Sequence, residues 1–206
     1  MPEQLRQQQL SGLYGLVDAA LSDPIPWGRA LAESGCPVIQ LRAKMWTPER
    51  IRFAAQALRT VTHEEGCLLI INDHPDIAVE VGADGVHLGQ DDLSVVAARR
   101  LVGPRMLIGL STHTIAQVKA AGLADYIGFG PIFQTQTKAQ AGSAVGPTRL
   151  QQAVENAPCP VVAIGGISPH NLASVRATGT RAWAVASALT QFGTAREAVA
   201  AMHPDC

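Results

Sequence analysis

A closed parallel α/β barrel of eight strand–helix units is the fold that this sequence predicts. Three observations predict it: eight short apolar runs, amphipathic stretches between most of them, and no Gly/Ser-rich linker or charge block. Nearly continuous apolar runs are typical of strands covered on both faces of a parallel sheet. Eight such units favour a single-domain (β/α)8 barrel of the TIM type. An open, doubly wound sheet is the alternative.

The predicted strands follow one another along the whole chain. They are the runs at 13–17, 37–41, 68–71, 85–88, 106–110, 126–130, 160–164 and 182–186. Helical spacing of apolar residues falls between them, as at 48–62, 93–102, 114–122 and 194–202. We therefore expect one domain over residues 1–206, in which residues 1–11 form an N-terminal extension.

Composition restricts the classes of partner. Of 206 residues, 47% are hydrophobic and only 4% aromatic, so aliphatic side chains must fill the interior. The 16 basic and 17 acidic residues give a formal charge of −1, which argues against a nucleic-acid or membrane surface. The sequence shows neither a signal peptide nor a membrane-spanning run, and its four cysteines form no CxxC pair. We expect a cytoplasmic protein.

The second predicted strand carries polar residues toward its end. In VIQLRAK, Gln40, Arg42 and Lys44 alternate, so the three side chains share one face of the strand and its exit. In a (β/α)8 barrel this exit is where function is expected, because the following loops meet there. An amide and two cations predict anion recognition, with Arg42 as a bidentate fork. The alternative is that both cations lie in solvent.

The third and fourth predicted strands end in carboxylates. Asn72 and Asp73 close one, and Asp91 and Asp92 follow the other. Because adjacent parallel strands are about 4.8 Å apart, carboxylates at neighbouring tips can share one hard cation. Mg²⁺ prefers one or two carboxylates together with waters and phosphate oxygens. The pattern predicts a Mg²⁺ site between these two strand tips, and the alternative is that Asp73 and Asp92 are ordinary helix N-caps.

Hydroxyl groups follow the fifth and sixth predicted strands. Ser111 and Thr112 close the fifth, where a hydroxyl could instead cap the next helix. The long connection after the sixth holds Thr135, Thr137 and Lys138. Such a connection suits a phosphate lid, with a surface loop as the alternative.

The last two predicted strands end in small residues. Gly165 and Gly166 follow the seventh, and Ser187 follows the eighth. Loops at these positions form the phosphate site of many such barrels. We therefore expect two phosphate-binding zones, one with a metal and cations and one rich in glycine.

Taken in order, these motifs resemble the thiamine phosphate synthase family. The resemblance runs from about Leu13 to Leu189 and includes LYxLVD, VIQLRAK, IIND, GADGVHLGQDDL, IGLSTHT, ADYIGFGPIF followed by TQTK, and PVVAIGGIS. The residues that it implies for hydroxymethylpyrimidine pyrophosphate are Gln40, Leu41, Arg42, Ala43, Lys44, Asn72, Ser111 and Lys138. Those that it implies for the thiazole phosphate are Thr135, Gln136, Thr137, Gly166, Ala186 and Ser187, and Asp73 and Asp92 are implied to hold Mg²⁺.

The resemblance also implies a reaction between two small-molecule substrates. Pyrophosphate leaves the pyrimidine methylene, and the thiazole nitrogen attacks that carbon. Arg42, Lys44, Ser111 and Lys138 form the implied catalytic set, since Mg²⁺ and cations can neutralise the leaving pyrophosphate. The nucleophilic nitrogen carries its own lone pair, so the reaction needs no general base.

Three positions depart from the family pattern, and three other functions stay open. Gln134 stands where the family often has Pro, Trp183 lies in the last strand, and Ala186 replaces a Val. One alternative function is a thiazole tautomerase, for which His113 is the nearest base. The others are a non-catalytic phosphate-binding barrel and another phosphate-binding isomerase or lyase. The intact QLRxK, IND, QDD and TxTK set favours the synthase reaction.

Overall fold

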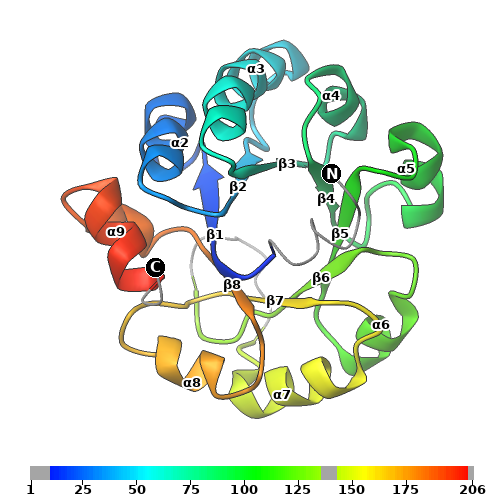
Figure 1. Ribbon diagram of the computed structural model, residues 1–206. Coiled ribbons are helices and arrows are strands. Elements are labelled where there is room, and N and C mark those ends of the chain that lie inside the picture. The colour runs from blue at the N-terminus through cyan, green and yellow to red at the C-terminus, as the bar shows by residue number, and fades with distance from the viewer. Residues whose placement is uncertain (1–9, 136–142, 204–206) are drawn as a thin grey trace.

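The protein folds into the predicted closed barrel (Figure 1). The computed structural model describes residues 10–135 and 143–203. Each strand pairs in parallel with the next, and the last pairs with the first. The strands are β1 (Gly12–Asp18), β2 (Val38–Arg42), β3 (Leu68–Asn72), β4 (Gly85–Leu88), β5 (Leu107–Thr112), β6 (Tyr126–Phe129), β7 (Val161–Ile164) and β8 (Ala182–Val185).

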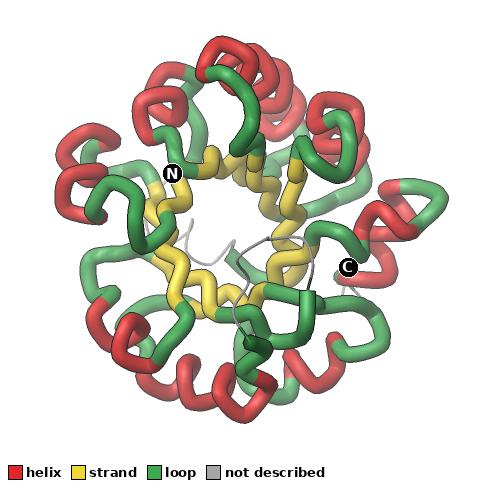
Figure 2. Tube along the Cα trace, turned by 180° about the vertical axis from the view of Figure 1, so that it is seen from behind, coloured by secondary structure: helices red, strands yellow, loops and turns green. Residues whose placement is uncertain are grey.

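Helices surround the barrel on the outside, as Figure 2 shows from the other end. They are α2 (Pro24–Glu33), α3 (Pro48–Glu64), α4 (Pro75–Glu80), α5 (Val95–Val102), α6 (Ile115–Ala120), α7 (Gly146–Asn156), α8 (Leu172–Arg176), the short 3₁₀ turn η1 (Leu189–Gln191) and α9 (Ala195–Met202). The stretches predicted as helices correspond to α3, α5, α6 and α9, so the predicted fold class is confirmed. Within the described ranges, no helix combines the length and the apolar character needed to cross a membrane.

Side chains alternate along each strand between the helices and the barrel interior. On β2, Ile39 and Leu41 are buried in clusters shared with the surrounding helices. Val38 instead packs in a separate interior cluster with Tyr14 and Tyr126. Residues that follow Val38 at period two therefore face inward and lie closer to the carboxyl ends of the strands.

Two aspartates fasten the amino-terminal end of the barrel. Asp84, just before β4, accepts hydrogen bonds at Oδ2 from Arg59 Nη1 (2.8 Å) and from the Leu69 amide of β3 (3.0 Å). Asp125, just before β6, likewise accepts from the Arg99 guanidinium and from the Ile108 amide of β5 (2.6 Å). Each carboxylate thus joins a helix to two neighbouring strands.

Candidate active site

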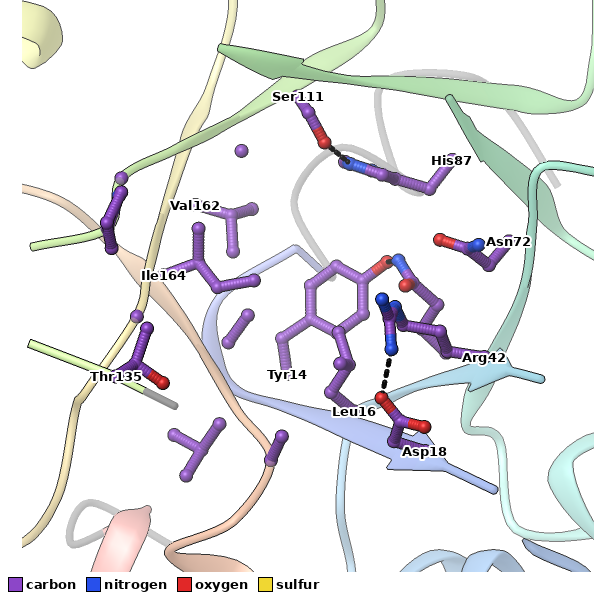
Figure 3. A pocket seen from close by; sticks show the side chains of 18 of the residues that line it. Tyr14, Leu16, Asp18, Arg42, Asn72, His87, Ser111, Thr135, Val162 and Ile164 are labelled. Carbon is purple, nitrogen blue, oxygen red and sulfur yellow. Dashed lines mark hydrogen bonds and ion pairs between the residues drawn. The ribbon is translucent and has the colours of Figure 1, made fainter. Parts of the chain in front are cut away.

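A pocket of about 160 Å³ opens at the carboxyl ends of the strands. Side chains from opposite sides of the barrel converge on it (Figure 3). The residues predicted for the site that line this pocket are Gln40, Arg42, Lys44, Asn72, Asp73, Ser111, Thr135, Gly166, Ala186 and Ser187. The two predicted zones therefore face one cavity.

Arg42 lies in the pocket and is held by an aspartate that the sequence analysis did not select. Arg42 Nη1 donates to Asp18 Oδ2, as Figure 3 shows, and Asp18 Oδ1 accepts from the Ala20 amide (2.9 Å). The side chains of Arg42 and Asp18 are 16% and 3% exposed, so Arg42 does not lie in solvent. The alternation Tyr14–Leu16–Asp18 along β1 was the available signal, because it places Asp18 on the inner face next to Arg42.

Lys44 pairs with Asp73, and Asp73 lies beside Asp92. Lys44 Nζ is 3.1 Å from Asp73 Oδ2, and Asp92 Oδ2 accepts from the Gly89 amide (2.6 Å). Burial raises the pKa of the Asp73 carboxyl. Lys44 opposes this shift, and the neighbouring Asp92 carboxyl adds to it. These two carboxylates therefore carry more negative charge than the single lysine balances.

Neither of these carboxylates is a helix cap. The N-cap position of α4 is His74, which makes no side-chain capping bond, and α5 is capped by Ser94 Oγ, which accepts from the Ala97 amide (3.3 Å). The capping alternative is wrong for Asp73 and Asp92. The same holds for Ser111, because Thr114 caps α6.

The pair of carboxylates has the chemistry of a Mg²⁺ site. No group of three or more His, Cys, Asp or Glu side chains placed to hold a metal occurs among residues 10–135 and 143–203. Mg²⁺ does not need one, since it commonly keeps several waters and uses one or two carboxylates with substrate phosphates. Asp73 and Asp92 thus fit Mg²⁺, whereas a structural zinc site would require more side-chain ligands. Asp91, next to Asp92, is exposed.

Five hydrogen-bonded side chains from five strands form the floor of the pocket. Each side chain is hydrogen-bonded to the next, with donor–acceptor distances of 2.8 to 3.1 Å, in the order Gln40, Tyr14, Tyr126, His87 and Ser111. Tyr14 and Tyr126 are 2% and 0% exposed. Sequence reasoning assigned no site role to Tyr14, Tyr126 or His87. Period two from the buried Gly85 places His87 on the inner face.

Two residues of the segment implied to bind substrate face the other way. The side chains of Leu41 and Ala43 are 1% and 5% exposed and pack in the cluster that contains Ile51 and Ala54 of α3. Neither lines the pocket. A substrate contact through their side chains is therefore excluded by the strand's alternation, and only main-chain atoms remain available. Gln136, Thr137 and Lys138 lie outside the described residues.

The glycine pair after β7 lets the connection after β6 approach closely. Ile132 N donates to Ile164 O (2.9 Å), and Phe133 N donates to Gly165 O (3.0 Å). Gly165 and Gly166 have φ values of +100° and +63°, and a Cβ at Gly166 would collide with the Gln134 carbonyl oxygen. The pair thus fixes the start of this connection at the pocket.

The departures near the last strand differ in their consequences. Trp183 lies on the helix side of β8, 4% exposed, and its Nε1 donates to the Met202 carbonyl (2.7 Å). It does not line the pocket, whereas Ala186 does. Only the second departure can therefore change the shape of the pocket through its side chain.

Comparison with known proteins gives one consistent result. A family model described as thiamine monophosphate synthase matches residues 13–189. The thiamine-phosphate synthase of Pelotomaculum thermopropionicum is 45% identical over 184 residues, covering 82% of this chain and 84% of that protein. The thiamine-phosphate synthase of Anaeromyxobacter dehalogenans is 38% identical over 200 residues, covering 96% and 89%. The solved thiamine phosphate pyrophosphorylase of Pyrococcus furiosus superposes with a TM-score of 0.89 at 32% identity, covering 97% of this chain and 96% of that one. This chain belongs to the thiamine monophosphate synthase family.

Proposed function

We propose that this protein is a Mg²⁺-dependent thiamine phosphate synthase. It condenses 4-amino-2-methyl-5-(diphosphooxymethyl)pyrimidine with 4-methyl-5-(2-phosphooxyethyl)thiazole and releases pyrophosphate. The observation that carries the proposal is the grouping of Arg42, Lys44, Asp73 and Ser111 around one pocket in a chain of this family. We propose that residues 1–206 act as one catalytic domain in the cytoplasm. Cys36, Cys67 and Cys159 are free thiols, as a reducing compartment favours.

The cations are suited to an anionic leaving group. Asp18 fixes Arg42, so its guanidinium is oriented before a ligand arrives. Lys44 adds a second positive charge, and Asn72 and Ser111 add polar side chains in the same pocket. Charge that develops on departing oxygens is best stabilised by such preorganised groups, because they need no reorganisation during the reaction.

Asp73 and Asp92 would hold Mg²⁺. When bound, the ion supplies positive charge against the departing pyrophosphate. Burial raises the pKa of Asp73 and the neighbouring Asp92 carboxyl adds to this shift, so two ionised carboxylates here are unfavourable without a cation.

The condensation balances without proton transfer. The C–O bond at the pyrimidine methylene breaks, and its electron pair leaves with pyrophosphate. The lone pair of the thiazole nitrogen forms the new C–N bond to the same carbon. The aminopyrimidine ring can spread positive charge, so we propose that bond breaking precedes bond making. The main task of the protein is to stabilise charge and orient the substrates.

The glycine-rich side of the pocket is proposed for the thiazole phosphate. Gly166, Ala186, Ser187 and Thr135 line it. Gln136 and Thr137, which lie outside the described residues, are also proposed to bind the thiazole phosphate. Lys138, likewise outside them, is proposed to bind the pyrophosphate. Small side chains leave room for a heterocycle and expose main-chain amides to a phosphate.

One feature also accommodates the tautomerase alternative. His113 lies at the pocket, and its Nδ1 is 2.6 Å from the Gly130 carbonyl oxygen. A carbonyl oxygen only accepts, so Nδ1 carries a proton and a neutral His113 would have a basic Nε2. This reaction would leave the Asp73–Asp92 pair and Arg42 without a task, and we therefore favour the synthase.

The test is direct. Purified protein is incubated with both substrates and Mg²⁺, and thiamine phosphate and pyrophosphate are quantified. We expect the two products in a 1:1 ratio, and none of either after chelation of the metal. Conversion of the thiazole phosphate alone into a tautomer would favour the alternative. Absence of both products from folded protein with Mg²⁺ present would reject the proposal.

A further inference from the structure

In the hydrogen-bonded series of side chains at the pocket floor, the first and last residues have a proposed role in substrate binding, whereas the three residues between them have none. Gln40 Nε2 donates to the Tyr14 hydroxyl (2.8 Å), which lies 2.9 Å from the Tyr126 hydroxyl. The Tyr126 hydroxyl is 3.1 Å from His87 Nδ1, and His87 Nε2 is 2.9 Å from Ser111 Oγ. Gln40 and Ser111 belong to the proposed substrate-binding set. Tyr14, Tyr126 and His87 take no part in the reaction derived above.

Close packing holds these middle residues together. The ring centroids of His87 and Tyr126 are 5.5 Å apart, and those of Tyr14 and Tyr126 are 6.1 Å apart. Gly109 of β5 lies against the contact between Tyr126 and His87, and a Cβ there would collide with the Tyr126 ring and with His87 Nδ1. The contact therefore depends on the lack of a side chain at this inward-facing position.

The number of available protons determines which group donates in each of these hydrogen bonds. Each hydroxyl has one proton, and a neutral imidazole has one N–H. Tyr14 and Tyr126 are buried, and among the described residues their hydroxyl protons have no acceptor outside this set. Because Gln40 Nε2 donates to Tyr14, the Tyr14 proton therefore goes to Tyr126 and the Tyr126 proton goes to His87 Nδ1. His87 must then carry its proton on Nε2 and donate it to Ser111 Oγ. The proton of Ser111 remains for the pocket.

The opposite direction would suit this pocket poorly. If Gln40 accepted through its oxygen, every bond would reverse, and Ser111 would donate to His87. Ser111 would then offer only lone pairs to the pocket. Arg42 and Lys44 line the same pocket and favour an anion there, and an anion needs donors.

We propose that Tyr14, Tyr126 and His87 are positioning residues that direct the Ser111 hydroxyl proton into the pocket. Resting on the proposed function, the acceptor is an oxygen of the substrate pyrophosphate. A serine hydroxyl ordinarily rotates to suit its surroundings. Here it is committed as a donor before the ligand arrives, as preorganisation requires.

The state of His87 can be measured without any substrate. Long-range ¹H–¹⁵N correlation spectra of ¹⁵N-labelled protein report which imidazole nitrogen carries the proton. The chain has 6 histidines, and the His87→Gln variant identifies the signals of His87. We expect the Nε2–H form in the wild type and loss of this preference in Tyr126→Phe. An Nδ1–H form in the wild type, or unchanged signals in Tyr126→Phe, would overturn the proposal.

Binding of inorganic pyrophosphate with Mg²⁺, measured by calorimetry, tests the consequence for Ser111. Loss of one hydrogen bond to a charged group should raise Kd about tenfold in Tyr126→Phe, His87→Leu and Ser111→Ala. Combining His87→Leu with Ser111→Ala should add little, because both remove the same donated proton. Fully additive effects, or wild-type Kd in Tyr126→Phe, would contradict the proposal.

Two further variants separate positioning from general stability. Thr112→Val removes a buried hydroxyl from β5 that bonds to the Gly128 carbonyl (2.9 Å), and this residue does not line the pocket. We expect it to lower stability but leave Kd unchanged. His87→Gln keeps one donor and one acceptor, so it should bind pyrophosphate more tightly than His87→Leu. A Thr112→Val effect on Kd equal to that of Tyr126→Phe, or equal Kd in both His87 variants, would assign these residues a merely structural role.

These readouts separate the inference from the proposed function. Neither the tautomer nor pyrophosphate binding requires turnover. A protein that makes no thiamine phosphate but shows the expected tautomer and Kd changes would refute the function and support the inference. An active enzyme with unchanged kcat, KM and Kd in Tyr126→Phe would refute the inference alone.

Discussion

The two ends of the barrel use aspartate in opposite ways. At the amino-terminal end, Asp84 and Asp125 each pair with one arginine and accept a strand amide. At the carboxyl-terminal end, Asp73 and Asp92 lie together beside the partly exposed Lys44. The first arrangement is complete within the protein, whereas the second carries excess negative charge.

This difference separates structural from functional carboxylates in one motif. GADGVHLGQDDL contains Asp84, which joins β3 and β4 to α3, and also Asp92, which lies beside Asp73. An aspartate whose charge and hydrogen bonds are satisfied locally stabilises the fold. A pair that repels without an added cation is suited to bind one.

The largest expected effect is on catalysis at the carboxyl end. Asp92→Asn should lower kcat/KM about 1,000-fold, since it removes a proposed metal ligand where charge develops. Steady-state kinetics with Mg²⁺ present measures this, and thermal unfolding checks the fold. Asp91→Asn is the matched control, because Asp91 is the adjacent exposed carboxylate. Equal rates in the two variants would place the metal elsewhere.

The next effect is on stability at the amino end. Asp84→Asn should reduce the free energy of unfolding by about 2 kcal/mol, because the partly buried Arg59 loses its counter-charge and the Leu69 amide keeps only a neutral acceptor. Urea unfolding measures this loss, and kcat should stay near the wild-type value. Glu80→Gln, in the exposed Arg52–Glu80 pair, should cost less than about 1 kcal/mol. A large loss of kcat in Asp84→Asn would undo the distinction between the two ends.

Asp18 shares features with the aspartates of both barrel ends, and its substitution should change the kinetics less than Asp92→Asn does. It lies at the carboxyl end yet pairs one to one with Arg42. Asp18→Asn should raise the KM for the pyrimidine pyrophosphate about tenfold, because the guanidinium loses its charged anchor. Initial rates at varied pyrimidine concentration measure this. An unchanged KM would mean that Arg42 needs no fixing.

The smallest expected effect is a gain in stability. Without Mg²⁺, Asp73→Asn should raise Tm by about 1–2 °C, because burial of the Asp73 charge and its repulsion from Asp92 together outweigh its pairing with Lys44. The pKa of Asp73 is raised in the folded protein, so protonation favours folding. The Tm of the wild type should therefore equal that of the variant in acid and become lower than it as pH rises through the raised pKa of Asp73.

Added Mg²⁺ provides the control for this gain. An ion that binds only the folded state stabilises it, so saturating Mg²⁺ should make the wild type the more stable of the two proteins. Thermal scans with and without Mg²⁺ across pH measure both effects. A variant less stable than the wild type without metal would contradict the repulsion.

The sequence predicted the strands well because each is a short run buried on both faces. It could not decide between caps and ligands at Asp73 and Asp92, since that choice depends on where each helix begins. The helices begin at Pro75 and Val95, so His74 and Ser94 occupy the cap positions. Alternation along β2 did separate Gln40 and Arg42 from Leu41, although the resemblance included all three.

Contacts across the barrel were beyond sequence reasoning. Period two predicts that His87 and Tyr126 face inward, but it does not say which inward side chains meet. That depends on the stagger with which the sheet closes. Tyr14 of β1 and Tyr126 of β6 come from strands that do not pair, yet their hydroxyls are 2.9 Å apart.

The close packing at Gly109 restricts how related sequences can vary. A Cβ at this position would occupy the space of the Tyr126 ring and His87 Nδ1. A larger residue there can arise only together with a smaller or shifted neighbour at one of those positions. Positions 87, 109 and 126, far apart along the chain, should therefore change as a group during evolution, and alignments of relatives should show correlated substitution among them.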